Sequence, residues 1–183
     1  MKRVVWRGLD GLSLEYCTFQ LTGETKVCGQ VIGDMSGTLG RVNYEVRCAQ
    51  DGSTQGVAVQ FSTLRTESEL ELQRETNGIW KVRGEQRADL ANCLDVDIGV
   101  TPSTNAMAIR RLRLQLGESR ALTVAWLRFP EFKLTAMRQR YTRIGDNTYL
   151  YESLESGYKA ELTVDDDGIV QTYGSEWEIV TDS

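Results

Sequence analysis

The sequence predicts an all-β fold: a mostly antiparallel sheet that is curled or closed, with little helix. Apolar and polar residues alternate through most of the chain, which is the period of half-buried strands. Asn-Gly and Asp-Gly pairs, which favour hairpin turns, separate the alternating runs. The chain has 17 glycines but only two prolines, a ratio that suits turns and bulges more than linkers. With 183 residues and no low-complexity tract, we expect one domain over residues 1–183.

The alternating runs and the turns between them follow one another along the chain. The runs are Val42–Cys48, Val57–Phe61, Leu70–Leu72, Leu112–Leu116, Tyr149–Tyr151 and Ala160–Val164. The predicted turns are Asp51-Gly52, Asn77-Gly78, Gly145-Asp146-Asn147 and Asp167-Gly168. We therefore expect about twelve to fourteen strands joined in sequence, in a sheet that curls or closes to protect its edges.

Two segments depart from this pattern. Ser103–Leu112 is the strongest helix candidate, but the alternation that resumes after it favours a loop or a short turn. Residues 120–129 are apolar on both faces of a strand, with Leu122, Val124 and Trp126 on one face. Such a strand lies between two apolar layers, either as a central core strand or with one face lining a cavity.

Composition excludes several classes of function. The chain has no histidine, which removes Ser-His-Asp and Cys-His catalysis and histidine-ligated metals. Cys17, Cys28, Cys48 and Cys93 form no Cys-x-x-Cys pair, so we expect reduced, packed thiols. The net charge of −5 argues against binding nucleic acid. No apolar run is long enough to span a membrane, and Val4–Trp6 is too short for a secretory signal, so we expect a cytoplasmic protein.

Charge is unevenly divided in the second half of the chain. Residues 106–144 carry nine basic and two acidic side chains, whereas residues 145–183 carry one basic and ten acidic ones. Neighbouring strands that pair these charges across the sheet would explain the division. A local site for an anionic headgroup is the alternative interpretation.

The most informative stretch is Cys93–Leu112. Asp95 and Asp97 alternate with apolar residues, which places both carboxylates on one face of a strand. A polar loop with Thr101 and Asn105 follows, and then Arg110 and Arg111. These groups could form bidentate ion pairs that fix the loop, or a cluster that hydrogen-bonds a sugar or phosphate headgroup.

This stretch resembles the putative glycolipid-binding family of bacterial proteins, long described as a domain of unknown function. The resemblance rests on Trp6–Asp10, Cys93–Leu112, Gln139–Thr142 and Ala160–Gly168, and it spans nearly the whole chain. It implies a highly curved, mostly antiparallel sheet of the half-barrel or spiral β-roll kind, similar to the half-barrel of lipoprotein-localisation factors. It also implies a lipid or glycolipid ligand, held in an apolar cavity between the sheet and its cover.

We therefore expect a binding protein that is not an enzyme and needs no cofactor. The expected ligand-binding residues are Trp6, Asp95, Asp97, Thr101, Asn105, Arg110, Arg111, Trp126 and Tyr141, with Trp80, Phe129 and Met137 as further cavity residues. One alternative is a metal-dependent enzyme that processes a glycan or nucleotide sugar with Asp95 and Asp97. Another is a structural or partner-binding module. The sequence does not indicate an oligomeric state.

Overall fold

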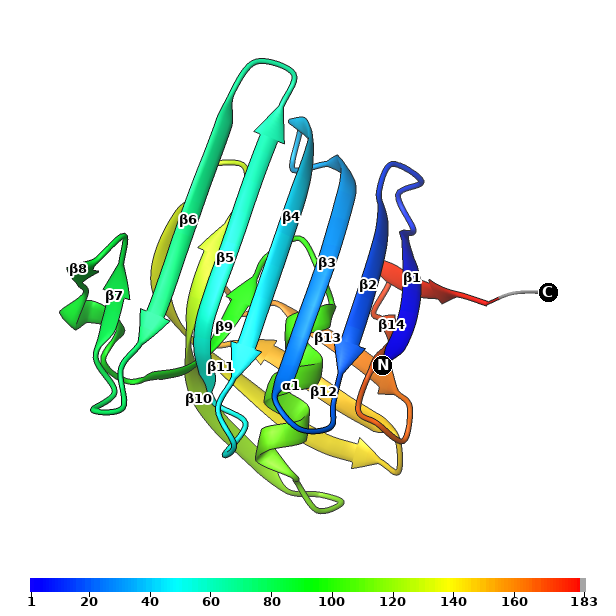
Figure 1. Ribbon diagram of the computed structural model, residues 1–183. Coiled ribbons are helices and arrows are strands. Elements are labelled where there is room, and N and C mark those ends of the chain that lie inside the picture. Colours follow the sequence, from blue (N-terminus) through cyan, green and yellow to red (C-terminus); the bar gives the residue numbers. More distant parts are fainter. Residues whose placement is uncertain (182–183) are drawn as a thin grey trace.

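The computed structural model describes residues 1–181 and contains one open, curved sheet of 15 strands, one α-helix and one short 3₁₀ helix (Figure 1). The all-β class and the curved, mostly antiparallel sheet that the sequence predicts are confirmed. No helix in residues 1–181 is long and apolar enough to cross a membrane.

The strands form two halves that meet where the ends of the chain pair. The first half contains β1 (Lys2–Gly8), β2 (Leu14–Gln20), β3 (Thr25–Asp34), β4 (Leu39–Cys48), β5 (Thr54–Thr63), β6 (Glu67–Arg74), β7 (Trp80–Val82) and β8 (Glu85–Gln86). The second contains β9 (Cys93–Ile98), β10 (Ser119–Arg128), β11 (Lys133–Gly145), β12 (Thr148–Ser153), β13 (Lys159–Val164), β14 (Val170–Tyr173) and β15 (Trp177–Val180). Strand β1 pairs with β15, so the sheet runs without a break from β8 to β9. Every pair is antiparallel except β9 with β10.

All four predicted turns join consecutive strands. Asn77-Gly78 lies between β6 and β7, and Asp167-Gly168 lies between β13 and β14. Gly78 and Gly168 have φ values of +86° and +76°, the left-handed backbone that glycine adopts without a steric penalty. The local turn signals therefore set the strand order through most of the sheet.

The expected loop at Ser103–Leu112 and the expected strand at Leu112–Leu116 are both wrong. Ser103–Leu112 is helix α1, and the chain leaves it through Arg113 in a left-handed conformation. Every side chain from Ser103 to Ile109 is buried, so contacts on several sides stabilise a helix that local sequence favours only weakly. The following leucines lie in the loop that leads to β10, not in a strand.

Helix α1 lies between the two halves of the sheet, which Figure 1 shows with β1–β6 in front and the second half behind. Ala106 and Met107 join an apolar cluster that includes the inner faces of β1–β6, β9 and part of β10. Ala108 and Ile109 join a second cluster, built on β11–β14. The helix therefore fills the space inside the curve of the sheet.

Alternate turns bring several loops to one end of the molecule, which we call the hairpin end. The turns at residues 9–13, 35–38 and 64–66 join β1 to β2, β3 to β4 and β5 to β6. The Leu9 amide donates to the Glu176 carbonyl at 2.7 Å, which ties the β14–β15 turn to the same end. Phe61, at the end of β5, packs edge-on against Phe129 in the β10–β11 turn, with ring centroids 5.2 Å apart. The candidate site lies at this end.

Candidate functional site

A partly open pocket of about 230 Å³ lies at the hairpin end of the second half of the sheet. Five aromatic side chains line it: Trp126, Tyr151, Tyr158, Tyr173 and Trp177. Polar side chains complete the wall: Asp97, Thr101, Asn105, Ser153, Ser156 and Glu176. We call it the aromatic pocket. Its lining residues include two acids and no lysine or arginine within residues 1–181.

Strand pairing brings the first two lining residues together. Asp97 and Trp126 are direct partners in the parallel β9–β10 pair. Gly99 follows β9, and a Cβ atom there would stand only 2.9 Å from Nε1 of Trp126. The glycine therefore lets the indole approach the chain between β9 and α1. Trp126 and Thr101, which follows Gly99 in this segment, both line the pocket.

Asp97 is held in place but remains an accessible acceptor at the pocket wall. Its carboxylate accepts hydrogen bonds from Gln139 Nε2 and, at 3.5 Å, from Thr104 Oγ1. Burial raises the pKa of Asp97 from 3.8 to about 6, and the two hydrogen bonds oppose that rise. The group is therefore ionised at neutral pH and becomes protonated in mildly acidic solution.

Asn105 and the tyrosines form a connected wall. The Asn105 side-chain amide donates to the Tyr141 hydroxyl at 2.8 Å, which positions Asn105 at the start of α1. Tyr141 packs against Tyr151, with ring centroids 5.4 Å apart. The ring centroid of Tyr151 in turn lies 6.2 Å from that of Tyr158 and 6.0 Å from that of Tyr173. The tyrosines that line the pocket therefore form one continuous aromatic surface.

A buried acid stands behind the loop that leads into α1. Oε1 of Glu15 accepts a hydrogen bond from Thr101 Oγ1 at 2.8 Å and another from the Tyr44 hydroxyl. The Tyr44 hydroxyl also lies 2.6 Å from Oγ of Ser103. Oε2 of Glu15 has no hydrogen-bond partner in residues 1–181. Burial raises the pKa of Glu15 from 4.5 to about 8, so the neutral acid is the favoured form at pH 7.

Part of the predicted site is assembled in the aromatic pocket. Asp97, Thr101, Asn105 and Trp126 line it, Tyr141 lies one hydrogen bond behind, and the further candidate Met137 also lines it. Residues that the sequence analysis did not single out supply the rest of the aromatic wall: Tyr151, Tyr158, Tyr173 and Trp177. Tyr151 sits in a recognised alternating run, where an inward tyrosine looks the same as a core residue.

The other predicted residues lie away from the pocket. Arg111 forms a bidentate ion pair with Asp95. This agrees with the first alternative from the sequence, in which ion pairs fix the loop. Arg110 donates to the Asp167 carbonyl in the β13–β14 turn. Trp6 is fully buried and donates to the Val170 carbonyl at 2.8 Å. These four side chains brace the fold.

The remaining two cavity candidates are also separated from the aromatic pocket. Trp80 is fully buried, and its indole donates to the Cys93 carbonyl at 2.9 Å. Phe129 packs in the phenylalanine cluster and lines a neighbouring pocket.

Charges of the second half do pair between neighbouring strands. Arg138 pairs with Glu155 at 2.9 Å, and Arg140 lies 3.7 Å from Glu152 on the adjacent strand. Basic residues of β11 thus face acidic residues of β12 and of the turn after it, as cross-strand charge pairing requires.

Comparison with known proteins agrees with the resemblance seen in the sequence. A family model described as "Putative glycolipid-binding" matches residues 3–178. The crystal structure of a DUF1089 family protein from Pseudomonas aeruginosa is similar to this fold, with a TM-score of 0.78 and 29% sequence identity. That similarity covers 90% of this chain and 91% of the other. No curated protein matches the chain.

Proposed function

The chain belongs to the putative glycolipid-binding family, and on that premise we propose that it binds the sugar head of a glycolipid in the aromatic pocket. The proposal rests chiefly on one observation: aromatic faces and carboxylates surround the same space, without a basic side chain in the described lining. Sugar hydroxyls donate hydrogen bonds to carboxylates, while the C–H faces of a sugar ring stack on aromatic rings.

The charge of the wall favours a neutral sugar over an anionic headgroup. Asp97 and Glu176 both line the pocket, and a phosphate between them would be repelled by like charge. The two arginines that the sequence suggested for a phosphate, Arg110 and Arg111, are engaged with Asp167 and Asp95 outside the pocket. Arg128 lies 5.2 Å from the ring centroid of Trp126 and pairs with Glu131, but it is not among the lining residues. A neutral, polyhydroxylated group fits this arrangement best.

The size and lining of the pocket favour the head of the lipid over its tails. A volume of about 230 Å³ is below the roughly 300–1,000 Å³ of pockets that enclose drug-sized ligands. Of the side chains that line it, Met137 and Pro102 are the aliphatic ones. The apolar cavity expected from the sequence is therefore replaced in this proposal by a polar and aromatic headgroup pocket, with the acyl chains left outside.

We further propose that the site binds without catalysis. Asp97 is held by Gln139 and Thr104, and Asp95 is turned away into its ion pair with Arg111. The two carboxylates therefore do not face a common substrate. Incubation of the protein with a glycolipid should release no free sugar by mass spectrometry, and steady release would instead support the enzyme alternative.

Isothermal titration calorimetry with short-chain alkyl glycosides tests the binding. We expect binding of a glycoside and none of a phosphocholine with the same alkyl chain. Asp97→Asn and Trp126→Ala should each raise Kd at least about tenfold, which corresponds to about 1.4 kcal/mol. Asp89→Asn is the matched control, because Asp89 lies outside the pocket, paired with Arg87, and its loss should leave Kd unchanged. Equal binding of both alkyl ligands, or full affinity in both pocket variants, would reject the proposal.

A further inference from the structure

Six aliphatic side chains are exposed together at the hairpin end of the first half of the sheet. Their exposed fractions are 47% for Leu9, 58% for Leu12, 54% for Leu14, 55% for Ile32, 58% for Leu39 and 89% for Leu64. They come from three alternate hairpins, β1–β2, β3–β4 and β5–β6, whose turns lie at one end of the sheet in Figure 1. We call this set the aliphatic edge.

The aliphatic edge differs from the rest of the outer face. Leu14 and Ile32 are direct partners on β2 and β3, so they form a continuous apolar surface. The next outward row contains Tyr16 and then three polar side chains, with Gln30 beside Asn43 and Asn43 beside Gln60. Single exposed leucines are ordinary on protein surfaces, but a cluster at adjacent loop tips indicates a surface that contacts something apolar.

The edge adjoins a second pocket, which shares lining residues with the candidate site. This second pocket, of about 300 Å³, is lined by Asp10 and Ser13 from the β1–β2 turn and by Asp34 and Met35 at the β3–β4 turn. Leu9 and Leu12 lie in the first of these turns, and Leu39 begins β4 directly after the second. This pocket shares Gly99, Glu176 and Trp177 with the aromatic pocket. Leu9, Leu12 and Leu39 therefore lie beside the second pocket, which adjoins the aromatic pocket.

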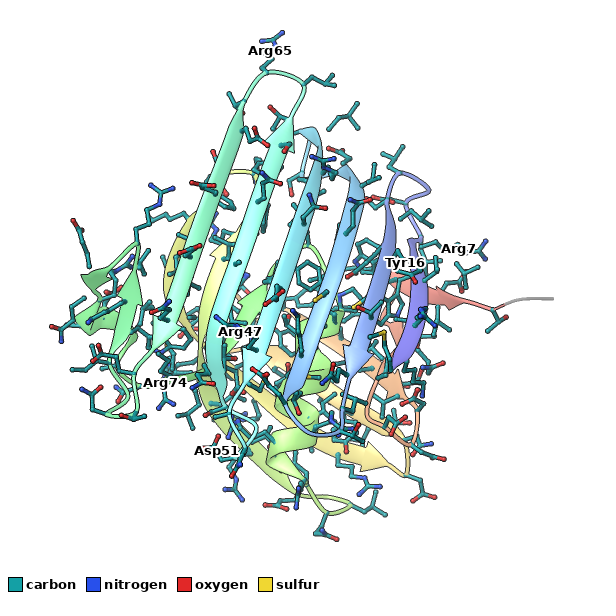
Figure 2. All side chains as sticks on the ribbon, viewed as in Figure 1. Arg7, Tyr16, Arg47, Asp51, Arg65 and Arg74 are labelled. Carbon is teal, nitrogen blue, oxygen red and sulfur yellow. The ribbon has the colours of Figure 1, made fainter. Side chains whose placement is uncertain are left out.

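The charges beside the edge match the phosphates of a lipid surface. Arg41 is the strand partner of Ile32, and Arg65 follows Leu64. Figure 2 shows Arg65 at the tip of the β5–β6 hairpin. Within residues 1–181 neither arginine forms an ion pair.

Three acidic side chains lie near the aliphatic edge, and each is engaged in a hydrogen bond or lines the second pocket. Asp10 accepts the Leu12 amide at 2.9 Å and lines the second pocket together with Asp34. Glu67 accepts a hydrogen bond from the Ser62 hydroxyl at 3.2 Å. Two of the three carboxylates thus belong to the pocket, while the two free guanidiniums flank the leucines.

We propose that the aliphatic edge docks on the surface of a phospholipid bilayer. The leucines enter the boundary between headgroups and acyl chains, and Arg41 and Arg65 contact lipid phosphates. Docking brings both pockets to the height of the headgroups while the tails of a bound glycolipid stay in the bilayer. Docking requires no sugar, so it stands or falls separately from the proposed glycolipid binding.

Co-sedimentation with vesicles of equal parts phosphatidylcholine and phosphatidylglycerol, free of glycolipid, tests the docking. The wild-type chain should sediment with the vesicles. The triple variant Leu12→Ser/Leu39→Ser/Leu64→Ser should partition at least about tenfold less, because three aliphatic side chains no longer enter the bilayer. The matched control is Leu94→Ser/Leu116→Ser/Ile144→Ser, which removes three exposed aliphatic residues away from the hairpin end and should bind as wild type.

Further measurements separate this proposal from the others. Asp97→Asn should keep vesicle binding, and the leucine variant should keep its affinity for a soluble glycoside. If the triple variant fails to fold by circular dichroism, Leu64→Ser alone, at the most exposed position, should still reduce partitioning several-fold. Equal sedimentation of the edge and control variants would overturn the proposal. So would light scattering that shows a dimer broken by the edge variant together with unchanged vesicle binding.

Discussion

Glu15 is a carboxylic acid at a position where strand alternation calls for an apolar side chain. It points to the same face of β2 as Cys17 and Phe19 and is fully buried. Its hydrogen bonds with Thr101 and Tyr44 link the first half of the sheet to the loop before α1. Close approach of Tyr44 requires Gly29, because a Cβ there would stand 2.2 Å from the Tyr44 hydroxyl oxygen. Three distant segments therefore meet at one buried acid.

This acid should make the stability of the protein depend on pH. The pKa of Glu15 rises from 4.5 to about 8 on folding, so the folded state holds the proton more tightly in that range. The free energy of unfolding should therefore be highest at low pH in this window and fall by up to about 1.4 kcal/mol per pH unit as pH rises toward 8. Asp97 also lowers the free energy of unfolding as pH rises, but only between pH 3.8 and about 6.

Urea denaturation between pH 6 and 8 isolates the contribution of Glu15, because the chain has no histidine to titrate there. Glu15→Gln should be folded and should lose most of the slope in that window. Tyr44→Phe should reduce stability without removing the slope. A slope that is unchanged in Glu15→Gln would contradict the assignment.

The affinity for sugar should depend on the protonation of Asp97, in a lower pH range than the stability effect of Glu15. Above about pH 6, Asp97 is ionised and can accept hydrogen bonds from sugar hydroxyls. Affinity for an alkyl glycoside should therefore be flat above that pH and decline below it as the carboxylate is protonated. In Asp97→Asn the affinity should be low and independent of pH in calorimetric titrations. A pH profile that Asp97→Asn shares with wild type would place the titrating group elsewhere.

At the scale of elements, Arg111 joins the last turn of α1 to strand β9. Its Nε lies 2.9 Å from Oδ1 of Asp95, and Asp95 is only 1% exposed. Arg111→Met would leave a buried carboxylate without its partner, so we expect a loss of about 3–5 kcal/mol in urea denaturation. Asp95→Asn/Arg111→Met should recover part of that loss.

Arg113→Met is the control for this ion pair, since Arg113 is exposed at the same end of the helix and should change stability by less than about 0.5 kcal/mol. Equal effects of the Arg111 and Arg113 variants would mean that the ion pair does not fasten the helix.

The strands could be predicted from sequence because their signals are local. Alternation and the Asn-Gly and Asp-Gly turns identify β4, β5 and β12 without knowledge of their neighbours. Helix α1 could not be predicted in this way, because its buried residues include Ser103, Thr104 and Asn105, whose polar side chains interrupt the apolar pattern of a core helix. The tyrosines of the pocket were missed for a different reason: an inward tyrosine shows its role only when the opposite wall is known.

At the scale of the whole molecule, pairing of β1 with β15 makes one sheet from two halves. This pairing joins the first and last strands, and no local signal in the sequence specifies it. It brings the β1–β2 turn beside the β14–β15 turn, where the Leu9 amide donates a hydrogen bond to the Glu176 carbonyl. Glu176 and Trp177 thereby reach both pockets at the hairpin end. The position of Glu176 and Trp177 in the site thus depends on the pairing of β1 with β15.

The tryptophan indole N–H signals in a ¹H–¹⁵N NMR spectrum test the central claim most directly. Trp126 and Trp177 line the aromatic pocket, whereas Trp6 and Trp80 are fully buried and donate to the Val170 and Cys93 carbonyls. The protein therefore carries two reporters and two internal controls. On titration with an alkyl glycoside, the signals of Trp126 and Trp177 should shift and saturate while those of Trp6 and Trp80 stay in place. Four unchanged signals, or equal shifts of all four, would contradict sugar binding in this pocket.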